Sequence, residues 1–133
     1  MKKITLFLLS SLCLSIYNLQ GQDAIEYPLF PGCGEGTANT VIDCSEFKMM
    51  QFIYSNLKCP DQAKAAGVSG EVEAKFTVTT SGDVKNGTIV SGLGHGCDEE
   101  VLRLIQMMPK FVPGKENGAV KEMEAFIYVK FNK

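Results

Sequence analysis

Residues 71–79 read EVEAKFTVT, and apolar and polar side chains alternate along this stretch without a break. A period of two is typical of a strand that buries one face and exposes the other to water. The apolar side chains that share one face of such a strand are Val72, Ala74, Phe76 and Val78. The stretch therefore predicts a half-buried strand that lies against a hydrophobic core.

A turn and a second strand follow this stretch. Residues 80–83 read TSGD, where Gly82 can adopt the positive φ of a tight turn. Residues 84–90 then predict a weaker strand, which Asn86 and Gly87 interrupt. The two strands should form a β-hairpin, since so short a turn makes antiparallel neighbours of them.

The last strand is predicted at about residues 120–131, where the alternation returns. The side chains expected to face the core are Met123, Ala125, Ile127, Val129 and Phe131, and those expected to face outward are Glu122, Glu124, Phe126, Tyr128 and Lys130. The two glutamates should discourage strand pairing near its beginning, because charges protect sheet edges. Phe126 and Tyr128 are either covered by the segment before the sheet or exposed for a partner.

Helices are predicted on both sides of the hairpin. Four apolar residues before it recur at three- and four-residue steps, namely Phe47, Met50, Tyr54 and Leu57. Asp43 and Glu46 have capping-box spacing, so this helix should begin near residues 43–45. Pro60 should end it and open a short Ala-rich helix that stops at Gly67.

A further helix is predicted from about Asp98 to Met107. It rests on the helical spacing of Val101, Leu102, Ile105 and Met108, and Pro109 should end it. The order is helix, short helix, strand, strand, helix, strand. This order predicts an α+β fold, in which a three-stranded antiparallel sheet has helices packed on one face, with a loop-helix extension before it.

The first 21 residues predict a secretory signal peptide. Two lysines precede an apolar run over residues 4–17, and polar residues follow up to Gly21. The run is short for a membrane span, which needs roughly 20 residues, and Leu12 before Cys13 disfavours lipid attachment. We expect cleavage after Gly21, a mature chain without a membrane span, and a periplasmic or secreted location.

Removal of those 21 residues from the 133-residue chain leaves 112, which is the size of one domain. The net charge of −2 would fall to −4, because two lysines leave with the signal peptide. No long basic stripe occurs, which argues against nucleic acid as a partner.

Residues 22–44 predict a loop-rich lead, since YPLFPGCGEG holds two prolines and three glycines. Residues 45–133 should form the domain, with its core at residues 58–131.

Residues 92–100, GLGHGCDEE, bring the only histidine, His95, close to Cys97 and three acids. A reactive thiol needs a lowered pKa, and the acids oppose the thiolate. Zinc sites usually present close ligand pairs such as C-x2-C, and the chain has none. We therefore predict a loop entering a helix with an acidic first turn, and no catalytic, cofactor-binding or metal residues. A thiol or metal site around Cys97 is the alternative.

Four cysteines would remain after export: Cys33, Cys44, Cys59 and Cys97. An even number in an exported chain predicts two disulfides. Four cysteines allow three pairings, and the sequence alone does not choose among them.

At about residues 58–131, the chain resembles the C-terminal domain of TonB energy transducers. The matching features are Pro60 with its Ala-rich helix, Gly67, GEVEAKFTV as first strand, Gly82 in the hairpin turn, and the helix that runs into MPKFVPGK. The lead FPGC…CSEFKMMQFIYSNLK is similar to that of Bacteroidetes-type members. The resemblance implies a three-stranded antiparallel sheet with helices on one side.

The resemblance also implies a role. In TonB this domain captures a short extended peptide, the TonB box of an outer-membrane transporter, which pairs with the last strand. This implies a noncatalytic module that binds a protein or peptide, with a homodimer through the same edge as the alternative. The candidate partner-binding residues are Ala125, Phe126, Ile127, Tyr128, Val129 and Lys130. Docking should favour the C-terminal half of the strand.

Two expectations follow from comparison with that family. Transducers have an anchor and a long spacer, whereas about five residues separate Gly21 from YPLF and reach at most ~18 Å. We therefore expect a freestanding exported module.

The second expectation concerns the disulfides. Family members commonly carry Tyr where Cys59 stands, so our hypothesis pairs Cys59 with Cys97. It also pairs Cys33 with Cys44, because these two cysteines are close in sequence and bracket a Gly-rich loop. Each bond would contribute about 2–4 kcal/mol.

Overall fold

The structure is a computed structural model that describes residues 24–132 of the chain. The predicted signal peptide lies outside the described residues. Within residues 24–132, no helix has the length and apolar character needed to cross a membrane.

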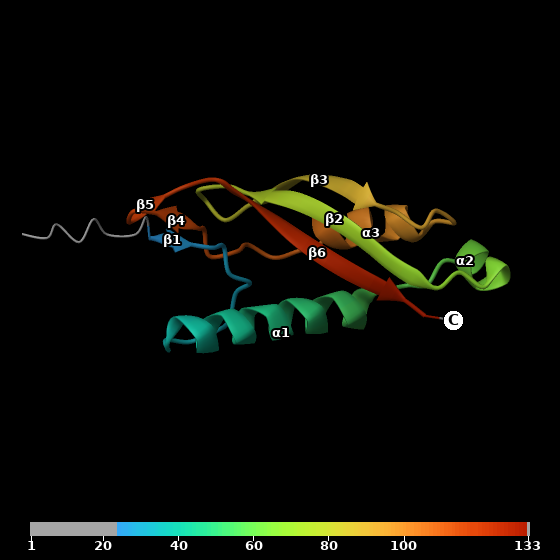
Figure 1. Ribbon diagram of the computed structural model, residues 1–133, viewed down its shortest axis with the longest axis horizontal. Helices are drawn as coiled ribbons and strands as arrows, with labels where there is room; N and C mark the ends of the chain where they lie inside the picture. The colour runs from blue at the N-terminus through green and yellow to red at the C-terminus, as the bar shows by residue number, and fades with distance from the viewer. Residues whose placement is uncertain (1–23, 133) are drawn as a thin grey trace, which may run out of the picture.

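The main sheet has three antiparallel strands in the order β3-β2-β6 (Figure 1). These strands are β2 (Gly70–Val78), β3 (Val84–Ser91) and β6 (Met123–Phe131). β2 pairs with both neighbours, so β3 and β6 form the two edges. The predicted three-stranded antiparallel sheet is confirmed.

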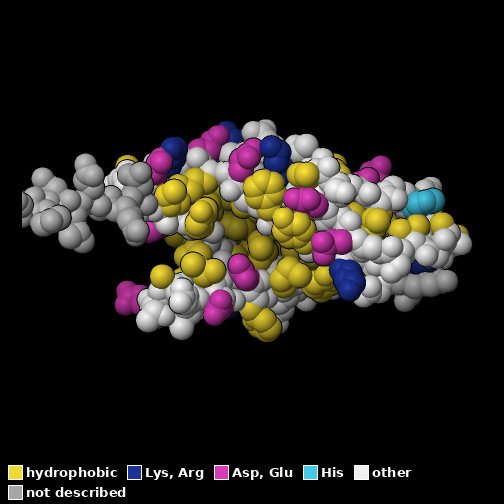
Figure 2. All heavy atoms as spheres, in the orientation of Figure 1, with side chains coloured by type: hydrophobic (Ala, Val, Ile, Leu, Met, Phe, Trp, Pro, Cys, Tyr) yellow, Lys and Arg dark blue, Asp and Glu magenta, His cyan; other side chains and the backbone are white. Residues whose placement is uncertain are grey.

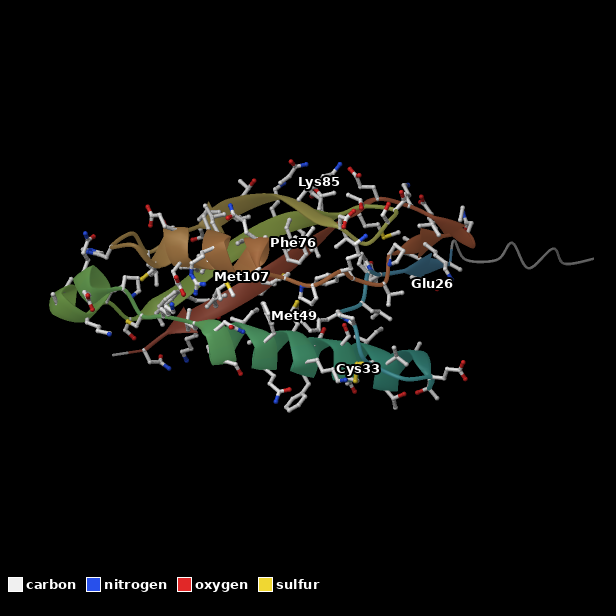
Figure 3. The ribbon with its side chains drawn as sticks, turned by 180° about the vertical axis from the view of Figure 1, so that it is seen from behind. Glu26, Cys33, Met49, Phe76, Lys85 and Met107 are labelled. Atoms are coloured by element: carbon white, nitrogen blue, oxygen red, sulfur yellow. A yellow bond between two sulfur atoms is a disulfide. The ribbon has the colours of Figure 1, made fainter. Side chains whose placement is uncertain are left out.

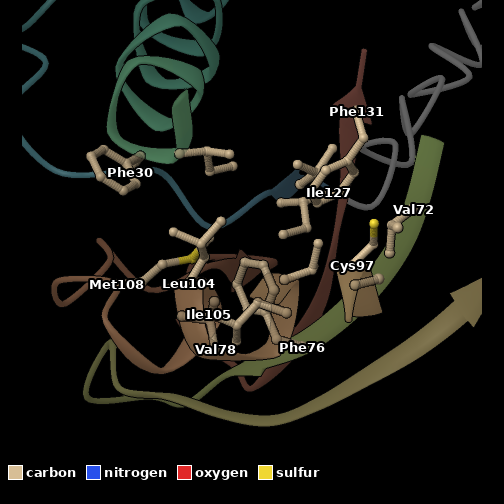
Figure 4. Close-up of a cluster of buried hydrophobic side chains, with 14 of the residues drawn as sticks. Phe30, Val72, Phe76, Val78, Cys97, Leu104, Ile105, Met108, Ile127 and Phe131 are labelled. Carbon is tan, nitrogen blue, oxygen red and sulfur yellow. The ribbon is translucent and has the colours of Figure 1, made fainter. Parts of the chain in front are cut away.

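The core lies on one face of this sheet, as the alternation predicts. The inward side chains of β2 and β6 that are buried are Val72, Ala74, Phe76, Val78, Ile127, Val129 and Phe131. Helix α3 (Cys97–Gln106) covers that face with its apolar side, which includes Val101, Leu104 and Ile105 (Figure 4). The third predicted helix is therefore confirmed within a residue or so at each end.

Two glycines occupy the positions predicted for them. Helix α2 (Asp61–Ala66) ends at Gly67, whose φ of 63° is left-handed and whose amide donates to the carbonyl of Lys64. Gly82 has a φ of 86° in the hairpin turn. A side chain there would meet the Phe111 carbonyl oxygen at 2.1 Å, so the turn packs against the chain before β6.

The first helix begins earlier than predicted. Helix α1 spans Ala38–Asn56, and the Thr37 hydroxyl caps it by accepting from the Thr40 amide. The expected capping role of Asp43 is wrong, because Asp43 lies inside the helix. The predicted boundary between a lead ending at residue 44 and a domain starting at residue 45 consequently falls within α1.

A second, smaller sheet was not predicted. It joins β1 (Ile25–Glu26), β4 (Lys115–Glu116) and β5 (Ala119–Val120) in the order β1-β4-β5. Asn117 and Gly118 form the turn between β4 and β5, both with positive φ, as two-residue hairpin turns require. This sheet ties the lead, which was expected to be loop, to the segment before β6.

Aromatic side chains connect α1 to the core. The ring of Phe30 lies 5.7 Å from that of Phe52 on α1 and 5.5 Å from that of Phe111, which in turn lies 5.5 Å from Phe76. The Phe30 amide donates to the Ser45 hydroxyl at 2.7 Å, a buried bond. These contacts place α1 alongside β6 (Figure 1).

An ion pair fixes the other end of α1. The Glu100 carboxylate accepts from Arg103 at 2.7 Å and from the Lys58 amide at 2.7 Å. The Arg103 guanidinium also donates to the carbonyl oxygen of Asn56 at 2.9 Å, and Asn56 is the last residue of α1. The hydrogen bond from Arg103 is the main reason why the pKa of Glu100 lies below its usual value. The pair therefore joins α1, the linker to α2, and α3.

A candidate binding groove between the edge strand and the first helix

The outer edge of β6 presents backbone groups that no described strand pairs with. The Lys130 amide donates to the Tyr54 hydroxyl at 3.1 Å, so it points away from β2. Because backbone groups alternate in direction along an antiparallel strand, those of Glu124, Phe126 and Tyr128 also point away from β2. A strand laid along this edge could pair with all three residues.

Helix α1 forms a second wall opposite this edge. Figure 2 shows a hollow lined by hydrophobic side chains between α1 and the sheet. Two cavities lie there, of about 310 and 420 Å³, and they share Glu46, Met49 and Phe126. Together they make a continuous trough, which we call the α1–β6 groove.

The groove is apolar inside and acidic at its margin. Met49 projects from α1 into the space between the helix and the sheet (Figure 3). The other apolar residues that line it include Leu29, Ile42, Met50, Phe111, Ala125 and Ile127. Its charged residues are Glu46, Glu71, Glu124 and Lys130.

The six predicted partner-binding residues divide into two sets. Phe126, Tyr128 and Lys130 direct backbone groups to the open edge, whereas Ala125, Ile127 and Val129 turn theirs toward β2. Ile127 and Val129 also bury their side chains in the core. The sequence reasoning did not identify the edge groups of Glu124 or the wall residues of α1.

Phe126 and Tyr128 remain largely uncovered, with 48% and 49% of their surface exposed. The Tyr128 hydroxyl donates to the Glu73 carboxylate at 3.3 Å. The negative charge of Glu73 is the first cause that raises the pKa of Tyr128, followed by this hydrogen bond. An aromatic surface under negative potential therefore flanks the groove.

The cysteines follow the hypothesis only in part. Cys33 and Cys44 form a disulfide with their Cα atoms 6.0 Å apart, which attaches the lead to α1. Cys59 and Cys97 are thiols in this structure, so the second hypothesised bond is not formed in it. The Cys97 sulfur points into the core beside Val72 (Figure 4), whereas the Cys59 sulfur faces the Pro60 carbonyl oxygen at 3.9 Å.

Residues 92–100 form the expected loop and helix start. The Asp98 carboxylate accepts from the Leu93 amide at 2.9 Å and so closes the loop onto α3. Cys97 is completely buried, and burial is the first cause that raises the pKa of its thiol, which opposes a thiolate. His95 is exposed in the loop with a φ of 55°. Residues 24–132 hold no cluster of three or more histidine, cysteine or acidic residues that could bind a metal ion.

A third cavity, of about 360 Å³, lies where α2 and α3 meet. Its charged lining includes Glu100 and Arg103, which already bind each other and the end of α1. These groups serve the fold, so the α1–β6 groove is the stronger candidate for a binding site.

The fold and the groove define a small α+β domain whose three-stranded sheet leaves one edge strand open beside a helix. The model of a known family, described as Gram-negative bacterial TonB protein C-terminal, matches residues 55–132. The chain belongs to this family, as the sequence resemblance indicated. Domains of the family are noncatalytic and generally take part in energy transduction for outer-membrane transport.

A solved structure agrees on the fold, and a second is reported beside it. The solution structure of Helicobacter pylori TonB-CTD (residues 179–285) is 22% identical, with a TM-score of 0.50 over 66% of this chain and 79% of that one. The Pseudomonas aeruginosa TonB CTD is 20% identical, with a TM-score of 0.43 over 57% of this chain and 77% of that one. None of the curated proteins compared with the chain matched it.

Proposed function

We propose that this protein is an exported, noncatalytic module that binds an extended segment of a partner protein by strand addition to β6. The observation that carries the proposal is the open edge at Glu124, Phe126 and Tyr128, whose backbone groups face the α1–β6 groove. Main-chain hydrogen bonds give such complexes their affinity, and flanking pockets select side chains. The family's role in outer-membrane transport and its periplasmic setting favour a segment of an outer-membrane transporter as partner.

A titration of ¹⁵N-labelled protein with TonB-box peptides tests the proposal. We expect the amide signals of Glu124, Phe126 and Tyr128 to shift with added peptide. Their constancy at millimolar peptide would exclude strand addition at β6.

Two variants at one position isolate the backbone contribution. Phe126→Pro removes an outward amide without removing a bond to β2, and proline is tolerated at edge strands. Phe126→Ala keeps that amide and removes the same ring. We expect the proline variant to bind peptide about tenfold more weakly than the alanine variant, because one main-chain bond is lost. Equal affinities would point to side-chain contacts alone.

Self-association through β6 is the alternative. Two copies could pair their edges, yet α1 lies beside the edge of each copy and would meet the other (Figure 1). Sedimentation across a range of concentrations separates the two functions. A concentration-dependent dimer that peptide cannot dissociate would favour self-association.

A further inference from the structure

The α1–β6 groove has walls that differ in chemistry, so it should discriminate among extended segments. On its inner side stand three apolar side chains of α1, namely Ile42, Met49 and Met50. The two methionines are flexible and can adapt to different partners. On its outer side stand the half-exposed rings of Phe126 and Tyr128. An added strand points alternate side chains to these two sides.

Charge along the groove is unbalanced. Glu124 is paired with Lys75 at 3.0 Å, but neither Glu46 nor Glu71 has a cation within ion-pair distance among residues 24–132. Glu46 lines both cavities and therefore stands midway along the groove. Lys130 is the one basic residue among the lining residues of the two cavities.

Glu71 stands next to the outer wall. It lies directly across the strand pair from Lys130, and with Glu73 it contributes to the negative potential at the Tyr128 hydroxyl. A cation beside Tyr128 would meet carboxylates and the face of an aromatic ring, which also attracts cations. The outer side of the groove is thus suited to lysine or arginine.

We propose that the occupant of the α1–β6 groove is an extended protein segment that alternates apolar residues with lysine or arginine. This proposal rests on strand addition at β6. The apolar side chains lie against the apolar residues of α1, and the basic side chains lie beside Tyr128 in the cavity that Glu71 and Glu46 also line.

Three capped peptides of one length test the charge preference on the full exported chain: SVKVKVS, SVQVQVS and SVEVEVS. We expect the lysine peptide to bind most tightly and the glutamate peptide about tenfold more weakly at low salt. The difference should shrink at 0.5 M salt, since exposed charges are screened there.

Substitutions locate the preference. The double variant Glu46→Gln, Glu71→Gln should bind the three peptides with a smaller spread of affinities than the wild type. The double variant Glu35→Gln, Glu99→Gln removes the same charge outside the groove and should preserve the spread. Folding of each variant is checked by its ¹⁵N spectrum.

The possible outcomes separate the two proposals. Equal binding of all three peptides, with shifts at the amides of Glu124, Phe126 and Tyr128, would overturn the charge preference and leave strand addition standing. Tightest binding by the glutamate peptide would overturn the preference as well. No shift with any peptide would overturn both proposals.

Discussion

The Tyr54 hydroxyl of α1 accepts a hydrogen bond from the Lys130 amide of β6 at 3.1 Å. This bond joins the helix to the open edge at one end of the α1–β6 groove. It also occupies the last outward amide of the strand, so the stretch open to a partner runs from Glu124 to Tyr128. Tyr54 thus marks where an incoming strand must end.

Tyr54→Phe should open that end. We expect the Lys130 amide to exchange with solvent faster, because its partner is lost, and the free energy of unfolding to fall by about 0.5–1.5 kcal/mol. Hydrogen exchange followed by NMR measures the first effect, and urea unfolding measures the second. Tyr27→Phe, at a 65% exposed tyrosine that lines the other cavity of the groove, should change neither quantity.

Phe30→Ala should detach α1 from the core. Phe30 is 7% exposed and contacts both Phe52 and Phe111, so its removal leaves a cavity that costs about 3–5 kcal/mol. Phe47→Ala is the matched control, since Phe47 lies on α1 with 69% of its surface exposed and its loss should cost less than about 0.5 kcal/mol. Urea unfolding compares the two. Similar losses would mean that Phe30 does not hold the helix.

Arg103→Gln should weaken the join between α1 and α3. The change leaves the buried Glu100 carboxylate with only the Lys58 amide, and it removes the donor to the Asn56 carbonyl. We expect a loss of about 1–3 kcal/mol in urea unfolding at pH 7. Lys64→Gln breaks the exposed pair with Asp61 and should cost little, because surface pairs contribute little.

Glu100 should make stability depend on acid pH. Its pKa is lower in the folded protein than in the unfolded chain, where a glutamate titrates at about 4.3. The resulting stabilisation is present above the unfolded pKa and disappears as the pH falls through the folded pKa. The loss of stability between pH 6 and pH 3 should therefore be smaller in Glu100→Gln than in the wild type or in Glu99→Gln. Equal slopes for all three proteins would show that Glu100 is not the group involved.

The Cys33–Cys44 bond should stabilise the beginning of α1. It closes a loop between residues 11 apart, so replacing both cysteines by serine should cost about 2–3 kcal/mol. Peptide mapping of the unreduced protein should recover this bond together with two alkylated thiols, at Cys59 and Cys97. Recovery of Cys33 linked to Cys59 or to Cys97 would contradict the pairing.

Much of the fold could be predicted because its strands and its third helix carry their own periodicity. Val72 to Val78 alternate, and each apolar side chain of that run is buried. The start of α1 was predicted wrongly. Asp43 and Glu46 have the spacing of a capping box, but both lie inside the helix, and Thr37 is the residue that caps it. The small sheet was missed because two-residue strands are too short to show a period.

The groove was beyond prediction from local pattern. Alternation placed Phe126 and Tyr128 on the outward face, where they are half exposed. The position of α1 beside β6 depends instead on contacts between distant residues, such as Phe30 with Phe52 and Tyr54 with Lys130. No periodicity in the chain encodes such contacts.

The central claim is that a partner segment becomes a strand beside β6. Intermolecular nuclear Overhauser effects between labelled protein and bound peptide test it most directly. We predict contacts from peptide backbone protons to the backbone of Glu124, Phe126 and Tyr128, with peptide side chains near Met49. Contacts confined to the cavity around Lys58 and Arg103, or to the β3 edge, would contradict it.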